Sequence, residues 1–208
     1  MGMREETRSG RRKEIEDAAC RLLETQGYAG ASMLSVAKAV GASNETLYRW
    51  YGDKKGLFRA VAEANAETVR ARLDAALAGQ GDPIAALTEV GEPLLKMLTG
   101  PRAVALNRAA AADPTGELGK AIAEGGREAV LPRIVALVAA GIRAGRLDVS
   151  SAEAGADLFL RLLIGDWQVR RVIGAMEVPE QAAIAARARE AMVAFLTLCA
   201  PANDPLTI

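Results

Sequence analysis

The stretch from Ser32 to Tyr51 constrains the fold of this chain more than any other. It reads SMLSVAKAVGASNETLYRWY, which predicts two short helices joined by a turn at Gly41. A glycine there can adopt the left-handed conformation that ends a helix, and Ser43 can then cap the next helix by accepting a hydrogen bond from a free backbone N–H. Two helices joined in this way form a helix-turn-helix, whose second helix can enter the DNA major groove.

Helical spacing divides the residues of this motif between a core and an outer face. In the first helix the spacing predicts core positions for Leu34, Val36, Ala37 and Val40. In the second helix Leu47 faces the core, which leaves an outward set of five residues: Asn44, Glu45, Thr46, Tyr48 and Arg49. These side chains carry the donors, acceptors and ring faces that base edges and phosphates require.

We therefore expect nine residues to contact DNA. Asparagine suits adenine, arginine suits guanine and a tyrosine ring can meet a thymine methyl, whereas an acid selects the cytosine amino group. The expected base readers are Asn44, Glu45, Tyr48 and Arg49, and the expected backbone contacts are Ser32, Thr46, Trp50 and Lys54. Ser43, the cap of the second helix, completes the nine.

The motif resembles the amino-terminal domain of the tetracycline-repressor (TetR) family from about Arg12 to Val61. The resemblance is carried by Gly27-Tyr28, Ser32, Val36-Ala37, Val40-Gly41-Ala42-Ser43, Thr46-Leu47-Tyr48 and Lys54…Leu57-Phe58. The sequence departs from the family pattern at four positions, with Glu45 for a common Gly, Trp50 for Tyr or His, Tyr51 for Phe and Ala31 for Thr. The resemblance implies an all-α fold with a three-helix DNA-binding head, residues 1–59, and a larger helical body for ligand binding and dimerisation, residues 60–208.

The rest of the chain also reads as helices. Beyond the motif, apolar spacing and capping residues predict helices over about 11–26, 53–78, 83–99, 102–112, 115–144, 150–175 and 179–199. Ser150 and Glu153 match a capping box, and the tail from Pro201 to Ile208 is expected to fray.

Charge is divided unevenly along the chain. The 26 Lys and Arg balance the 26 Asp and Glu. Residues 1–59 carry 11 basic against 8 acidic side chains, whereas residues 60–208 carry 15 against 18. The basic excess therefore lies in the segment that would neutralise DNA phosphates.

Residues for catalysis or metal binding are scarce. The chain has no histidine, no CxxC pair and no phosphate-binding glycine motif, which argues against an enzyme and predicts no catalytic residue, cofactor or metal site. Cys20 and Cys199 are expected to be reduced core thiols. No signal peptide or membrane-length apolar run is evident, so a cytoplasmic location without membrane association is expected.

The last two long helices offer two apolar faces. They are marked by Leu158, Leu162 and Val169, and by Ile184, Ala188, Met192 and Phe195. A homodimeric four-helix bundle would bury both faces, and the alternative is that both are buried within one subunit. In the TetR family the last two long helices form the dimer in this way.

The family resemblance further implies an effector cavity between the middle helices. Its candidate lining is Met97, Leu98, Leu106, Asn107, Phe159, Leu163 and Trp167, which favours a small apolar or aromatic effector. These residues also suit an ordinary core. The chain is thus expected to be a homodimeric, ligand-responsive repressor of a palindromic, double-stranded DNA operator. The alternative is a helical ligand-binding or interaction protein whose head no longer reads DNA.

Overall fold

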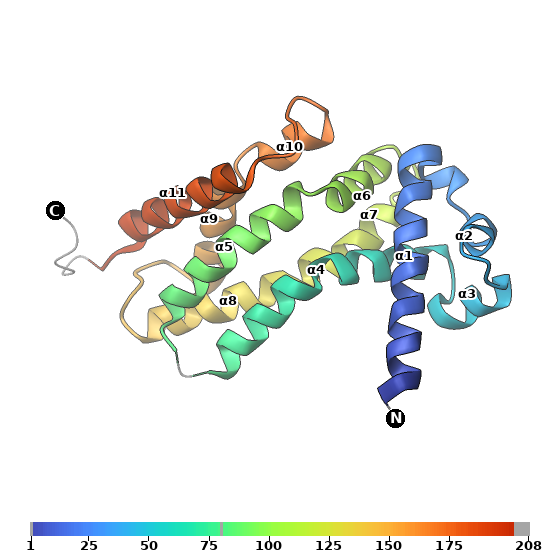
Figure 1. Cartoon of the computed structure of the whole chain (residues 1–208). Helices are drawn as coiled ribbons and strands as arrows, with labels where there is room; N and C mark the ends of the chain where they lie inside the picture. Colours follow the sequence, from blue (N-terminus) through green and yellow to red (C-terminus); the bar gives the residue numbers. More distant parts are fainter. Residues whose placement is uncertain (1, 80, 202–208) are drawn as a thin grey trace. The chain divides into compact units, whose positions relative to one another are not determined.

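The computed structural model describes residues 2–79 and 81–201, with side chains described from residue 8 onward. The described residues form helices and no strand (Figure 1), which confirms the predicted all-α fold. They group into two compact units, Met1–Asn65 with Arg102–Arg127, here called the head unit, and Ala66–Pro101 with Glu128–Ile208, here called the body unit. Residues 102–127 thus belong with the head, although the expected division put them in the body.

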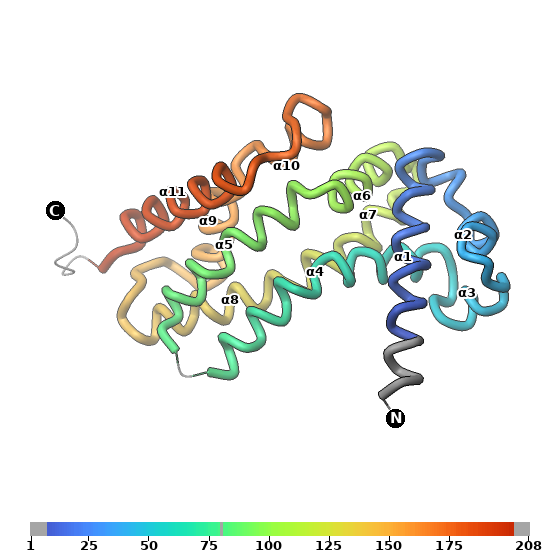
Figure 2. The backbone as a smooth tube through the Cα atoms, viewed as in Figure 1, coloured from blue at the N-terminus to red at the C-terminus, as the bar shows by residue number. Residues whose placement is uncertain are grey.

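The head unit packs the helix-turn-helix against the first helix of the chain. Its elements are α1 (Gly2–Gly30), α2 (Met33–Ala39), α3 (Asn44–Tyr51), the first part of α4 (Lys54–Ala78), α6 (Pro101–Ala111), α7 (Glu117–Ile122) and the π-helix η1 (Ala123–Arg127). Figure 2 shows α2 and α3 beside α1. Ile15, Val36, Leu47 and Phe58 are fully buried at its centre, which gives the head an apolar core of its own.

Two details of the head differ from the pattern read in the sequence. Leu34 was expected in the core, but its side chain is 50% exposed. Its neighbours are the buried Met33 and the half-buried Ser35. The face of α2 that meets the core is therefore turned relative to the expected one, so that Met33 is buried in place of Leu34. Gly27 has φ 66° and ψ −179° inside α1, so the first helix is interrupted there, and short helical structure then continues to Gly30.

The body unit is a bundle of helices around one core. Its elements are the second part of α4, α5 (Pro83–Thr99), α8 (Glu128–Arg143), α9 (Ala152–Ile164), α10 (Trp167–Val172) and α11 (Gln181–Cys199). Helix α5 packs against α8 and α11, and α9 packs against α8 and α11. Phe159 and Phe195 meet edge to face at the centre, with ring centroids 5.7 Å apart, a favoured aromatic geometry.

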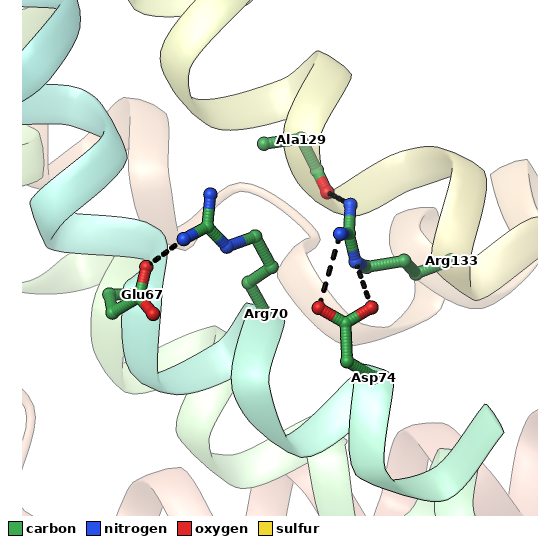
Figure 3. Close-up of polar contacts among 5 residues, drawn as sticks. All are labelled: Glu67, Arg70, Asp74, Ala129 and Arg133. Atoms are coloured by element: carbon green, nitrogen blue, oxygen red, sulfur yellow. Dashed lines mark hydrogen bonds and ion pairs between the residues drawn. The ribbon is translucent and has the colours of Figure 1, made fainter. Parts of the chain in front are cut away.

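An ion pair joins α4 to α8 within the body unit (Figure 3). The Arg133 guanidinium donates from Nε to Asp74 Oδ1 at 2.6 Å and from Nη2 to Asp74 Oδ2 at 3.1 Å. Arg133 also donates to the Ala129 carbonyl, and Glu67 pairs with Arg70 along α4. This bidentate contact fixes the orientation of the Arg133 guanidinium relative to the Asp74 carboxylate as well as the distance between them.

Two long helices predicted from the sequence are broken in the structure. The helix expected over 115–144 begins only at Glu117 and contains the π-helical turn η1 before α8. The helix expected over 150–175 is divided at Gly165, whose φ of 52° favours glycine. The N-terminal cap of α9 is Ser151, whose hydroxyl accepts from Ala154 N at 3.1 Å. The predicted capping box from Ser150 to Glu153 was therefore wrong, because the helix begins one residue later and has alanine at its third position.

Both cysteines are free and buried, as predicted, and burial raises the pKa of each thiol. The tail expected to fray lies outside the described residues from position 202 onward.

Candidate nucleic-acid interface

Helix α2 is held in place by reciprocal hydrogen bonds at its start. The Ser32 hydroxyl accepts from Ser35 N at 3.1 Å, and Ser32 N donates to the Ser35 hydroxyl at 2.8 Å. These bonds satisfy two backbone groups that would otherwise lack a partner. Ser32, an expected phosphate contact, is therefore first of all the cap of α2.

Helix α3 is fixed by a cap at one end and an apolar anchor in the middle. The Ser43 hydroxyl accepts from Thr46 N at 3.1 Å and lies 2.8 Å from the Thr46 hydroxyl. Gly41 has φ 61° in the turn before it, the left-handed conformation that the sequence predicted. Leu47 is fully buried, so one face of α3 is committed to the head core and the other is left outside.

The outward face of α3 is polar and aromatic. Glu45, Tyr48 and Arg49 are exposed, with half of the Tyr48 surface open to solvent. Thr46 and Asn44 are half-buried. Asn44 Oδ1 is buried without a hydrogen-bond partner among the described residues, which costs about 1–3 kcal/mol for such an oxygen. The structure thus brings Glu45, Tyr48 and Arg49 together at the surface, while Asn44 has its acceptor turned inward.

Lys54 is engaged inside the head unit. Its ammonium donates to the Tyr28 carbonyl and lies 3.8 Å from the centroid of the Tyr28 ring. Partial burial lowers the pKa of Lys54, and the nearby Asp113 carboxylate opposes that shift. One of its donors is therefore used within the head, so a phosphate contact would have to come from the others.

The sequence reading missed two arginines of α1 that lie on the rings of α3. The Arg8 guanidinium carbon is 5.8 Å from the centroid of the Trp50 ring, and that of Arg12 is 6.0 Å from the Tyr51 ring. Trp50 is half-buried and Tyr51 is buried. The available signal was spacing, because positions 8 and 12 continue the helical face of Ile15.

The seven residues expected to line an effector cavity are divided between the two compact units. Phe159 and Leu163 are buried in the body core, and Met97, Leu98 and Trp167 pack against it. Leu106 is instead buried in the head core, and Asn107 lies on the same helix with its amide donating to the Ala103 carbonyl at 2.8 Å. Leu106 and Asn107 thus belong to α6 of the head unit, and the other five residues belong to the body unit.

The seven residues expected at a dimer interface also separate. Ile184, Met192 and Phe195 are buried in the core of the body unit, so their side chains present little surface to a second copy. Leu158, Leu162 and Ala188 are half-buried, and Val169 is 62% exposed. The sequence reading missed Ile173, Val193 and Leu198, which are exposed by 69%, 66% and 63%.

Two further features bear on what the chain can do. Among the described residues, His, Cys, Asp and Glu side chains nowhere gather in a group of three that could hold a metal ion. In the same part of the chain, no helix is both long and apolar enough to cross a membrane.

Comparison with known proteins matches both parts of the chain. Residues 15–61 match the family described as bacterial regulatory proteins, tetR family. Residues 85–200 match the carboxy-terminal domain of AefR-like transcriptional repressors. No curated protein sequence matches the chain.

Solved structures with the same fold include three transcriptional regulators. A TetR transcriptional regulator from Agrobacterium tumefaciens is 30% identical, with a TM-score of 0.70 over 92% of this chain and 95% of that one. The flavonoid-responsive regulator FrrA is 26% identical, with a TM-score of 0.67 over 93% and 99%. A TetR-family regulator from Mesorhizobium loti, 23% identical, shares the fold with a TM-score of 0.74 over 93% and 98%.

Proposed function

This chain belongs to the TetR family of DNA-binding transcriptional regulators, and from that premise we propose that it is a ligand-responsive repressor that binds a palindromic operator as a homodimer. The observation that carries the proposal is the exposed row of Glu45, Tyr48 and Arg49 on α3, held outward by the buried Leu47. Residues 1–59 would supply the DNA-binding surface and residues 60–208 the effector and dimer contacts.

The residues of α3 would divide into base and backbone contacts. Arg49 can donate two hydrogen bonds to a guanine edge, the Tyr48 ring can meet a thymine methyl, and Glu45 can accept from a cytosine amino group. Asn44 would read adenine after its inward oxygen turns toward the groove. Ser43, Thr46 and Trp50 would contact phosphates, together with Ser32 of α2 and the remaining donors of Lys54.

A dimer would place two such helices on one operator. Leu158 and Leu162 of α9 are half-buried and Val193 and Leu198 of α11 are exposed, and a second copy would cover these apolar side chains. Large exposed apolar patches are uncommon on monomeric proteins. Two-fold symmetry in the protein matches a palindrome whose half-sites lie one or more helical turns apart.

The effector is proposed to be a small apolar or aromatic molecule. Its contacts would come from the body residues Met97, Leu98, Phe159, Leu163 and Trp167. The similarity to the flavonoid-responsive regulator FrrA supports an aromatic ligand. Such a ligand lowers DNA affinity only by the ratio of its affinities for the DNA-competent and incompetent states.

Binding to the DNA upstream of its own coding sequence tests the proposal. Fluorescence anisotropy should give tighter binding to this DNA than to a shuffled sequence, and Arg49→Ala should remove about 1–3 kcal/mol of that preference. Arg143→Ala, which alters an exposed arginine of α8, is the matched control. A flavonoid aglycone should release the DNA, whereas its glycoside should act less. Equal binding of wild-type protein to both DNA sequences would refute operator recognition.

A further inference from the structure

The first turns of α1 carry a basic run that the helix-turn-helix does not explain. Residues 8–13 read RSGRRK, four basic side chains without an acid among them. Arg8, Arg12 and Lys13 are exposed and Arg11 is half-buried. This run therefore presents concentrated positive charge at the surface of the head unit.

The geometry of α1 directs part of this charge toward α3. Positions 8 and 12 share a helical face with the buried Ile15 and Ala19. Beyond the buried part of this face, positions 8 and 12 are arginines. Their guanidinium groups lie over the Trp50 and Tyr51 rings of α3. A guanidinium stacked on a ring keeps the N–H groups at its edge available to a phosphate.

Arg11 fixes the run against the motif. Its Nη2 donates to the Val40 carbonyl at 2.6 Å, and its Nη1 pairs with Glu14 at 2.7 Å. Val40 is the carboxy-terminal cap of α2. The basic run is therefore tied to the end of α2 by Arg11 and laid against α3 by Arg8 and Arg12.

Gly10 in the middle of the run has no packing role among the described residues. It is exposed, and a Cβ atom added there would meet nothing within 4 Å. Glycine inside a helix costs about 1 kcal/mol relative to alanine, yet it lets another molecule approach the backbone closely. A molecule that approaches this part of α1 closely would therefore favour glycine over alanine at position 10.

We propose that residues Arg8–Lys13 of α1 are a second DNA-contacting element, which binds backbone phosphates beside the groove entered by α3, with Arg8 held on the Trp50 ring. The inference rests on the proposed DNA-binding face of α3 and extends it to another helix. Phosphate diesters are the chemistry that this run fits, because stacked arginines supply charge and directed donors together.

The salt dependence of DNA binding tests this element in the full-length protein. Each phosphate contact contributes about 0.9 to the slope of log K against log salt concentration. Arg8→Gln should therefore lower the slope by about 0.9 per bound head, or about 1.8 for two heads, and weaken binding to upstream and shuffled DNA by the same factor. Arg21→Gln is the matched control, because Arg21 is exposed on the same helix about 20 Å along its axis.

A second variant separates DNA contact from a structural role. Gly10→Ala should raise the melting temperature of the free protein and yet weaken DNA binding several-fold, whereas a residue that only affects folding would shift both in one direction. Wild-type slopes for both Arg8→Gln and Arg21→Gln would overturn the inference and leave DNA binding by α3 intact. Absence of salt-dependent binding by the wild-type protein would instead overturn both proposals.

Discussion

The contact between η1 and α4 in the head unit predicts that alanine has opposite effects on stability at two adjacent glycines. Gly125 is buried, and a Cβ atom added there would lie 2.4 Å from the Arg59 carbonyl oxygen, 3.0 Å from Ala62 Cβ and 3.1 Å from Glu63 N. Two of these atoms belong to the α4 backbone, so η1 or α4 would have to move. Gly126 has nothing within 4 Å of the same added atom.

Gly125→Ala should therefore destabilise the head, whereas Gly126→Ala should stabilise it. Overpacking of a tight site costs about 1–3 kcal/mol, and replacement of an unhindered helical glycine by alanine gains about 0.5–1 kcal/mol. The two variants should therefore differ by about 1.5–4 kcal/mol. For a unit the size of the head, about 90 residues, each 1 kcal/mol moves the melting temperature by about 4–8 °C, so the midpoints of head unfolding should differ by at least about 6 °C.

The measurement should report on the head alone, because the two compact units need not unfold together. The chain has two tryptophans, Trp50 in the head and Trp167 in the body. In a Trp167→Phe background, the fluorescence of Trp50 follows unfolding of the head as temperature or urea rises. Equal midpoints for Gly125→Ala and Gly126→Ala would refute the close approach of η1 to α4.

Three further predictions follow from the burial and ion pairs of the described residues. Val193→Arg should place unpaired like charges in the proposed dimer surface and yield a folded monomer by light scattering; an unchanged dimer would put the interface elsewhere. Burial raises the pKa of Glu16 above its ordinary value of 4.5, against the attraction of nearby arginines. Its protonated form is thus favoured in the folded head, and stability falls as pH rises through the window above 4.5. Glu16→Gln should raise the melting temperature at pH 7 and flatten this dependence, and an unaltered pH profile would contradict the assignment. The hydrogen bonds from Arg133 lower the pKa of Asp74, so their stabilisation is present above pH 3.8 and is lost as pH falls through the lower, folded-state pKa. Arg133→Gln should lower the melting temperature at pH 7 and diminish the loss on acidification, which thermal scans at several pH values would detect.

The helix-turn-helix was predictable because its determinants are local. A glycine with positive φ at position 41, a serine cap at position 43 and a buried leucine at position 47 act within a few residues of one another. Each can be read from a short window of sequence. The break at η1 was not predictable in this way, because it depends on a surface of α4 about 60 residues away in the chain.

Helix α11 shows why the apolar residues of a long helix do not identify their own partners. Met192 and Val193 are adjacent and both apolar, yet the first is 4% exposed and the second 66%. From the sequence, both Met192 and Val193 are candidates for burial. Which of the two is buried within the chain depends on where α5 and α9 pack against α11. The accessible residues left over, rather than the most regular apolar stripe, are therefore the ones to test for contact with a second copy.

The same reasoning applies to charge in the head unit. Lys54 lies within the part of the sequence that resembles a known DNA-binding domain, and its ammonium is nevertheless engaged by the Tyr28 carbonyl. Arg8 lies before that part, and its guanidinium rests on a ring of α3. A count of basic residues treats the two alike. The Lys54 ammonium, however, already uses one of its donors on the Tyr28 carbonyl and is held in place by that bond, whereas a guanidinium that lies on a ring keeps its edge donors for a phosphate. The salt slope should consequently depend more on Arg8 than on Lys54, although the sequence alone favours Lys54.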